Sequence, residues 1–469
     1  MPASRSVIRR LLRPPADAAG RRIAIAGVSG ILLTAPLSLQ QAVSPHPVVS
    51  WLLTSCGALL AVICLRPSWT PRVIVTSGAI VVCVVFCAVS AILGISQTVS
   101  ALQQSDRQLL CTDDVAPDTV VGGQEVSSGI DPYTSFNLLE AERKLGCPAY
   151  SVTPLRSGAF AALAAPPSGP QIERAAVAAV RGHPTGGLLV GFNYPSGTAL
   201  LGVLGAHGLV LISPLALLLA GLLIARRAEP SLRRVTILAL GSQAGLLALI
   251  GNARVDAVVA ALLIVALSKR RGLAMGIALG VACAVKQTAW FIAPALLVLA
   301  LREGNGRGAH GGFSRVFREP RYHLGALLAF AVINLPFIIA GPSAWIAGVF
   351  APQTQPEFPL GFGPGAGGQA GSGVVTAFAI LMIVAVVAGT ALCALAPRRW
   401  APVGVVISSL GLWIGPRSLG YYVALLGAVA VCTVVGSNLG QSAAVDAPDE
   451  RLDVRVVSST AGGLARVGS

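Results

Sequence analysis

The sequence predicts an all-α membrane protein that crosses the lipid bilayer many times. Apolar residue types make up 54% of the 469 residues and charged types only 11%, whereas soluble domains carry about 25% charged residues. The mean hydropathy is +0.75. Apolar runs close to the roughly 20 residues needed for one crossing recur along the chain. This composition excludes a water-soluble globular domain and predicts about twelve transmembrane helices.

The apolar runs give the approximate position of each predicted helix. The stretch 272–301 is too long for one crossing, so we expect two short helices that meet near Lys286. A long outer loop follows the third helix. The predicted spans are 23–42, 49–65, 73–97, 207–225, 235–251, 255–268, 272–285, 288–301, 323–341, 373–395, 401–415 and 420–437.

Basic residues set the expected orientation, because the cytoplasmic loops of membrane proteins are enriched in Lys and Arg. With the N-terminus inside, most of the 34 Lys and Arg residues fall on the cytoplasmic side. We therefore predict a cytoplasmic basic segment 1–22, a transmembrane domain 23–437 with outer loops 99–206 and 342–373, and a disordered cytoplasmic tail 438–469. The net charge of +15 is spread between apolar runs, so nucleic acid is not an expected partner.

Charged residues within or at the edge of a membrane are costly, so each is a functional candidate. The candidates on the predicted outer face are Asp113, Asp114, Asp118, Asp131, Arg254, Asp256, Lys286 and Arg417. Basic side chains in such a place can hold a phosphate through charge-assisted hydrogen bonds. An aspartate can act as a general base on an incoming hydroxyl. This division of roles indicates transfer of a group from a lipid phosphate.

The same residues also have explanations without a function. The aspartates of the first outer loop can simply be solvated, and Arg254 with Asp256 can form an interfacial ion pair that caps a helix. Lys286 can extend its ammonium group to the membrane surface. Arg417 can be an exception to the charge bias with no role of its own.

The nine cysteines predict one disulfide at most. Seven lie inside apolar runs, where cysteine acts as a small buried apolar residue. Cys111 and Cys147 lie in the long polar loop, where a disulfide is allowed if that loop is outside the cell, free thiols being the alternative. No CxxC pair or Cys/His cluster with metal-binding spacing is present, so no metal site is predicted.

Seven short segments form a recognisable series along the chain. They are Cys111-Thr-Asp113-Asp114, Gly129-Ile-Asp131-Pro-Tyr133, Asn193-Tyr194-Pro195, Gly251-Asn252-Ala-Arg254-Val-Asp256, Gly276–Lys286, Asn334-Leu-Pro336 and Pro416-Arg417-Ser418 with Tyr421. Taken in this order, they resemble the actinobacterial GT-C type glycosyltransferases that use polyprenyl-phosphate sugars, many of them mannosyltransferases. The resemblance covers roughly residues 105–425. Two departures are that Pro294 comes late after Lys286 and that three predicted helices precede the first outer loop.

The resemblance implies a GT-C fold and a multi-pass protein of the cell membrane, with cytoplasmic termini and the active site on the outer face. A sugar, with mannose expected, would move from a polyprenyl phosphate to a lipid or glycan acceptor, without a cofactor or metal. The catalytic base would be Asp114, with Asp113 and Asp118 as alternatives. The donor phosphate would contact Lys286, Arg254 and Arg417, and the other substrate-binding residues would be Asp131, Tyr133, Tyr194, Asn252, Asp256 and Tyr421.

Two other functions remain open from the sequence. One is a transporter or flippase for a lipid-linked or anionic substrate, which predicts charges near the middle of the membrane and broken helices. The other is a non-catalytic membrane scaffold, which predicts that the first-loop aspartates do not reach any site.

Overall fold

The computed structural model describes residues 12–43, 47–148, 152–181, 187–251, 253–268, 272–304, 320–361, 363–365 and 372–445. These residues are mostly helical and contain one two-stranded sheet. Six helices are long and apolar enough to cross a membrane. They are α2 (Ala18–Val43), α4 (Val73–Leu102), α11 (Gly205–Arg227), α16 (Pro320–Ala340), α19 (Ser372–Leu395) and α21 (Gly420–Val445). The protein is therefore an all-α membrane protein.

Shorter helices occupy the other predicted spans. A helix of 13 residues is about 20 Å long, less than the roughly 30 Å of a bilayer core. The structure therefore supports six long spans, and the expected number of about twelve stays a prediction. The shorter elements are α3 (Pro47–Cys64), α12 (Pro230–Gly241), η3 (Ala244–Leu249), α13 (Asp256–Ser268), α14 (Leu273–Val285), η4 (Gln287–Phe291), α15 (Ala293–Gly304) and α20 (Val403–Ile414).

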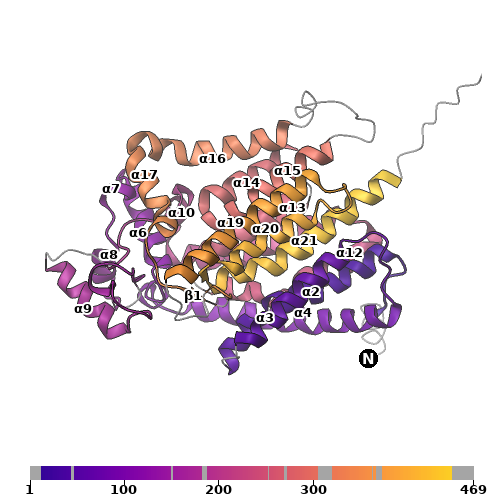
Figure 1. Ribbon diagram of the computed structural model, residues 1–469, viewed down its shortest axis with the longest axis horizontal. Coiled ribbons are helices and arrows are strands. Elements are labelled where there is room, and N and C mark those ends of the chain that lie inside the picture. Colours follow the sequence, from indigo (N-terminus) through magenta and orange to yellow (C-terminus); the bar gives the residue numbers. More distant parts are fainter. Residues whose placement is uncertain are drawn as a thin grey trace, which may run out of the picture.

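The long helices lie roughly side by side, and the elements of the outer loops gather at one end of this bundle (Figure 1). The start of α2 and the end of α21 lie at the opposite end. Short helices fill both loops. The first loop contains α5 (Asp106–Leu110), α6 (Val115–Ser127), α7 (Pro132–Ser135), α8 (Leu138–Leu145), η2 (Gly158–Phe160), α9 (Gly169–Val180) and α10 (Ser196–Gly202), and the second contains α17 (Pro342–Val349) and α18 (Ala351–Thr354).

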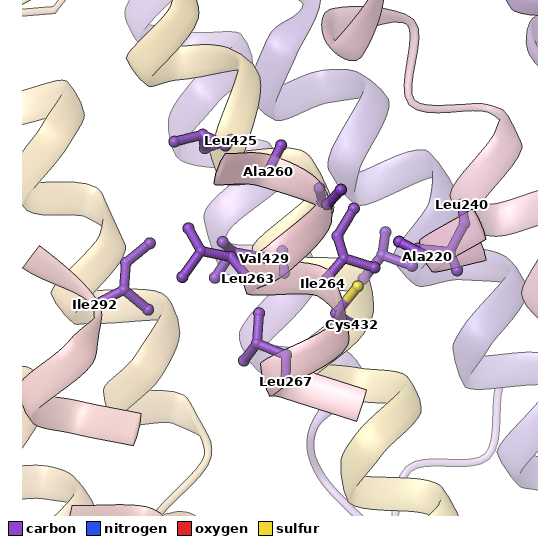
Figure 2. Close-up of a cluster of buried hydrophobic side chains, with 14 of the residues drawn as sticks. Ala220, Leu240, Ala260, Leu263, Ile264, Leu267, Ile292, Leu425, Val429 and Cys432 are labelled. Carbon is purple, nitrogen blue, oxygen red and sulfur yellow. The ribbon is translucent and has the colours of Figure 1, made fainter. Parts of the chain in front are cut away.

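The centre of the bundle is packed with apolar side chains on all sides of α13. Figure 2 shows Leu263, Ile264 and Leu267 of this helix among side chains that include Leu240 of α12 and Val429 of α21. The outward faces of α4, α16 and α19 are also apolar. A bundle that is apolar both inside and outside is suited to a lipid environment and not to water.

Helices α14 and α16 cross in close contact because two glycines remove the side chains between them. A Cβ atom at Gly276 would overlap the backbone oxygen of Tyr322, and one at Gly280 would overlap that of Ala326. Small residues four apart commonly allow this approach in membranes. Helix α14 then ends at Val285, and Lys286 is extended at φ −150° and ψ 139°. The predicted break near Lys286 is confirmed.

Short strands join the outer loops to one another. Strand β1 (Leu360–Gly361) pairs in parallel with β2 (Arg417–Ser418). Leu155 of the first outer loop forms an antiparallel bridge with Glu357 of the second. Three loops that are far apart in the sequence are thus held together at one end of the bundle (Figure 1).

The predicted disordered tail is corrected in its first part. Helix α21 continues to Val445, so residues 438–445 are helical and not disordered. The remainder of the predicted tail, 446–469, lies outside the described residues.

Candidate functional site

The structure brings together all three basic residues predicted to form the site, and each pairs with a carboxylate. Arg254 pairs with Asp113, Lys286 with Asp256, and Arg417 with Glu357. Five of these six residues are sequence candidates, and the first and last of them, Asp113 and Arg417, are 304 positions apart in the chain. The loops and helix ends therefore build one charged cluster, named here the outer charge cluster and defined by these six residues together with Asp114.

Lys286 and Asp256 form the most deeply buried pair of the outer charge cluster. The ammonium nitrogen lies 2.7 Å and 2.8 Å from the two carboxylate oxygens, and each side chain is 1% exposed. The same nitrogen is 4.3 Å from the ring centre of Tyr421 and 5.3 Å from that of Tyr194. Asp256 begins α13 and Lys286 follows the end of α14. The pair thus joins the start of one short helix to the end of the next.

Asp113 has two structural tasks. One carboxylate oxygen accepts hydrogen bonds from the backbone N–H groups of Val115 and Ala116, at 2.9 Å and 3.1 Å. These are unpaired donors at the start of α6, and capping them stabilises a helix. The other oxygen pairs with Arg254, whose guanidinium also lies 5.4 Å from the ring centre of Tyr421. Asp113 therefore fixes both the helix start and Arg254.

Asp114 has a different environment although it is the next residue. The Thr153 hydroxyl donates a hydrogen bond to its carboxylate. Arg417 lies on the other side of that hydroxyl, with its Nη2 atom 3.5 Å from Thr153 Oγ1. Asp114 is half-buried and forms no ion pair among the residues that the structure describes. A single hydroxyl thus separates the unpaired carboxylate from a guanidinium.

Glu357 is the member of the outer charge cluster that the sequence analysis missed. Its side chain is 5% exposed and pairs with Arg417, and its backbone is bridged to Leu155. One signal was available, since Glu357 is the only charged residue in the segment 342–373. An isolated charge in a Gly- and Pro-rich loop is a candidate of the same kind as Arg417.

Asp118 is set apart from the other aspartates by complete burial. Its exposed fraction is 0%, and neither carboxylate oxygen has a hydrogen-bond partner among the described residues. Burial, followed by the charges of Asp114 and Glu142, raises the pKa of Asp118 well above its usual value of 3.8. Asp118 is not available to an incoming substrate in this arrangement.

Asp131 and Tyr133 lie outside the outer charge cluster and support the loop. An Asp131 oxygen accepts from the Tyr133 backbone N–H at 3.0 Å and so caps α7. The Tyr133 hydroxyl donates to the backbone oxygen of Tyr194 at 2.6 Å, and its ring packs on Phe192 at 5.2 Å. Tyr133 thus holds Tyr194 beside Lys286. The remaining candidate, Asn252, lies outside the described residues.

Cys111 and Cys147 form a disulfide, with their Cα atoms 5.1 Å apart. It ties the segment just before Asp113 to the end of α8. Within the described ranges, no group of three or more His, Cys, Asp or Glu side chains is arranged to hold a metal ion.

Comparisons of the chain with protein-family models, with curated proteins and with solved structures found no match. The resemblance to polyprenyl-phosphate-dependent glycosyltransferases therefore rests on the sequence motifs alone.

Proposed function

We propose that this protein is a GT-C type membrane glycosyltransferase that moves a sugar, with mannose as the first candidate, from a polyprenyl phosphate to a lipid or glycan acceptor on the outer face of the cell membrane. The observation that carries this proposal is the position of Asp114. It is a half-buried carboxylate without a basic ion-pair partner among the described residues, one hydroxyl away from Arg417 and beside two further basic residues. A base beside several cations suits transfer from a phosphate.

The depth of the outer charge cluster supports a lipid-linked donor. Helices α13 and α14 have 13 residues each, and the Lys286–Asp256 pair lies at the end that they share. Helices of about 20 Å that begin at the inner surface stop roughly 10 Å below the outer surface of the hydrocarbon core. A phosphate attached to a membrane-embedded chain reaches this depth without leaving the bilayer.

In the proposed reaction, Asp114 takes the proton from the acceptor hydroxyl. The hydroxyl oxygen attacks the anomeric carbon, and the bond from that carbon to the phosphate oxygen breaks. Polyprenyl phosphate leaves with the bonding electron pair, so negative charge develops on its oxygen. The Nε atoms of Arg254 and Arg417 are buried and lack hydrogen-bond partners among the described residues. We assign them to the leaving phosphate, because buried unpaired donors are costly without such a partner.

Lys286 is assigned a different role from the one that the resemblance implied. Both of its short contacts go to Asp256, and it is enclosed by Tyr421 and Tyr194. A phosphate would have to displace a buried carboxylate to reach it, which is unfavourable. We propose that the pair holds Tyr421 and Arg254 in place.

The test is sugar transfer in membranes from radiolabelled polyprenyl-phosphate mannose, comparing wild type with Asp114→Asn. Loss of a general base lowers the rate by roughly 10²–10⁴-fold. Glu140→Gln is the matched control, because it removes a carboxylate of the same loop that is 54% exposed and pairs with Lys144 at the surface. Equal transfer by wild type and Asp114→Asn would rule out Asp114 as the base. Transfer lost equally in Glu140→Gln would show that the loop, and not the base, was damaged.

The alternative function is a transporter or flippase for an anionic or lipid-linked substrate. The fully buried Lys286–Asp256 pair favours it, since such pairs often mark ion or proton pathways. Substrate exchange across proteoliposomes containing the purified protein distinguishes the two. Exchange without any sugar transfer would support transport.

A further inference from the structure

Asp118 is a buried acidic residue that the proposed reaction does not use. It lies in the first turn of α6, four residues after Asp114, and residues at this spacing share one face of a helix. Glu142 of α8, which is 1% exposed, also acts on Asp118, and Tyr194 is a further titratable neighbour. The two carboxyl groups that act on Asp118 are thus both acidic, and no basic group acts on it among the described residues.

The packing of α6 keeps Asp118 away from water. A Cβ atom at Gly122 would contact the Phe192 ring at 2.8 Å, and one at Gly123 would overlap the backbone of Gly202 in α10. The helix therefore cannot shift outward without losing these close contacts. An ionised carboxylate at such a place, without a donor or a cation, would carry a large desolvation cost.

We propose that Asp118 is held as a neutral, protonated acid at neutral pH, and that it is a positioning residue which fills the space beside Asp114 without adding a second negative charge. This inference rests on and deepens the proposed function, because a general base must be the ionised member of the pair. Complete burial distinguishes Asp118 from the half-buried Asp114, and different surroundings commonly give two neighbouring carboxyl groups different roles.

The inference makes Asp118→Asn a close mimic of the wild-type side chain. An amide has the shape of a carboxylic acid and no charge, so this variant should fold and keep Asp114 ionised. Asp118→Ala is the matched control, since it also removes the acid but leaves a cavity. A loss of stability seen in Asp118→Ala but not in Asp118→Asn therefore reports the lost packing and not the lost charge.

The first experiment measures the thermal stability of the purified full-length protein against pH. Folding raises the pKa of Asp118 above its unfolded value of 3.8. At any pH between the unfolded and the folded pKa, the folded state therefore binds more protons than the unfolded state. Wild type therefore loses stability as pH rises through that window. Both variants lack this loss, so their melting temperatures relative to wild type should increase by a few degrees between about pH 4 and about pH 8.

A constant difference across this range would overturn the inference, because it would mean that Asp118 titrates alike in the folded and unfolded states. An infrared band of a protonated carboxyl group, present in wild type at neutral pH and missing in Asp118→Asn, gives an independent reading. Stabilisation of wild type but not of Asp118→Asn by a divalent cation would also contradict it, since a cation and not a proton would then balance the charge.

The second experiment measures sugar transfer at neutral pH. Asp118→Asn should keep transfer within about three-fold of wild type, whereas Asp114→Asn should lose it. Loss in Asp118→Asn equal to that in Asp114→Asn would make Asp118 an ionised base. If wild type shows no transfer from any donor, the proposed function fails, while the stability and infrared measurements still decide the protonation of Asp118.

Discussion

The ammonium group of Lys286 lies within 2.8 Å of both carboxylate oxygens of Asp256. Lys286 follows the end of α14 and Asp256 begins α13, and each side chain is only 1% exposed. Each group replaces water for the other at a place where both side chains are buried in the protein. The pair also fixes the start of α13 relative to the end of α14. The stability of the outer charge cluster should therefore depend on keeping the two charges together.

Breaking this pair should be more damaging than removing it. Lys286→Met and Asp256→Asn each leave one buried charge without its partner, which costs about 3–5 kcal/mol. The double variant leaves neither charge and should be more stable than either single variant. Unfolding of the detergent-solubilised protein by denaturant measures all three.

The surface pair Lys144–Glu140 provides the control for this comparison. Its atoms are 3.0 Å apart, but its side chains are 68% and 54% exposed. Lys144→Met should leave unfolding unchanged, because exposed pairs contribute little. Additive effects of Lys286→Met and Asp256→Asn would show that the two charges do not stabilise each other.

The disulfide should stabilise the loop that carries Asp113 and Asp114. Cys111 and Cys147 are 36 positions apart, and closing a loop of this length contributes on the order of 3–4 kcal/mol. Cys111→Ser with Cys147→Ser should therefore unfold more readily than wild type. Reductant should lower the stability of wild type alone.

Peptide mapping by mass spectrometry without reductant checks the bond directly. A linked pair of peptides containing Cys111 and Cys147 is expected from wild type. Free thiols at both positions in protein isolated under oxidising conditions would contradict the structure.

The sequence was sufficient for the long apolar helices and for every member of the outer charge cluster except Glu357, but not for the pairing within it. Apolar runs locate each helix because every span must bury its backbone polar groups in lipid. The break at Lys286 was readable for the same reason, since a largely apolar stretch of 30 residues exceeds one crossing. Whether a helix of 12 or 13 residues completes a crossing depends on neighbouring helices, so the span number was not fixed.

The roles of the three first-loop aspartates could not be separated from the sequence. Asp113, Asp114 and Asp118 are the same residue type in one short segment. Their different environments come from contacts that form only in the folded protein. Arg254 pairs with the first, Thr153 donates to the second, and close packing on α10 buries the third. Nothing in the sequence immediately around the three aspartates encodes these partners.

The crossing of α14 and α16 should tolerate no side chain at Gly276. An alanine there would press its methyl group into the backbone of Tyr322, and overpacking of this kind costs roughly 1–3 kcal/mol. Gly276→Ala should also weaken the Lys286–Asp256 pair, because Lys286 directly follows α14. Denaturant unfolding measures the first effect.

Gly221→Ala in α11 is the matched control, because a Cβ atom there meets nothing within 4 Å. It should leave stability unchanged or slightly raised, since alanine favours a helix over glycine. A similar loss of stability in both variants would contradict the close crossing of α14 and α16.

The proposed orientation can be tested by labelling single cysteines in whole cells. Ser128, at the end of α6, and Ser231, at the start of α12, are both exposed. They lie in segments that the charge bias places outside and inside the cell, respectively. In a background with Cys56, the exposed native thiol, replaced by alanine, a membrane-impermeant maleimide should label Ser128→Cys in intact cells. It should label Ser231→Cys only after permeabilisation. The opposite result would place the outer charge cluster in the cytoplasm, where Asp114 would face a different pool of acceptors. Labelling of both positions from the same side of the membrane would mean that an even number of crossings separates them.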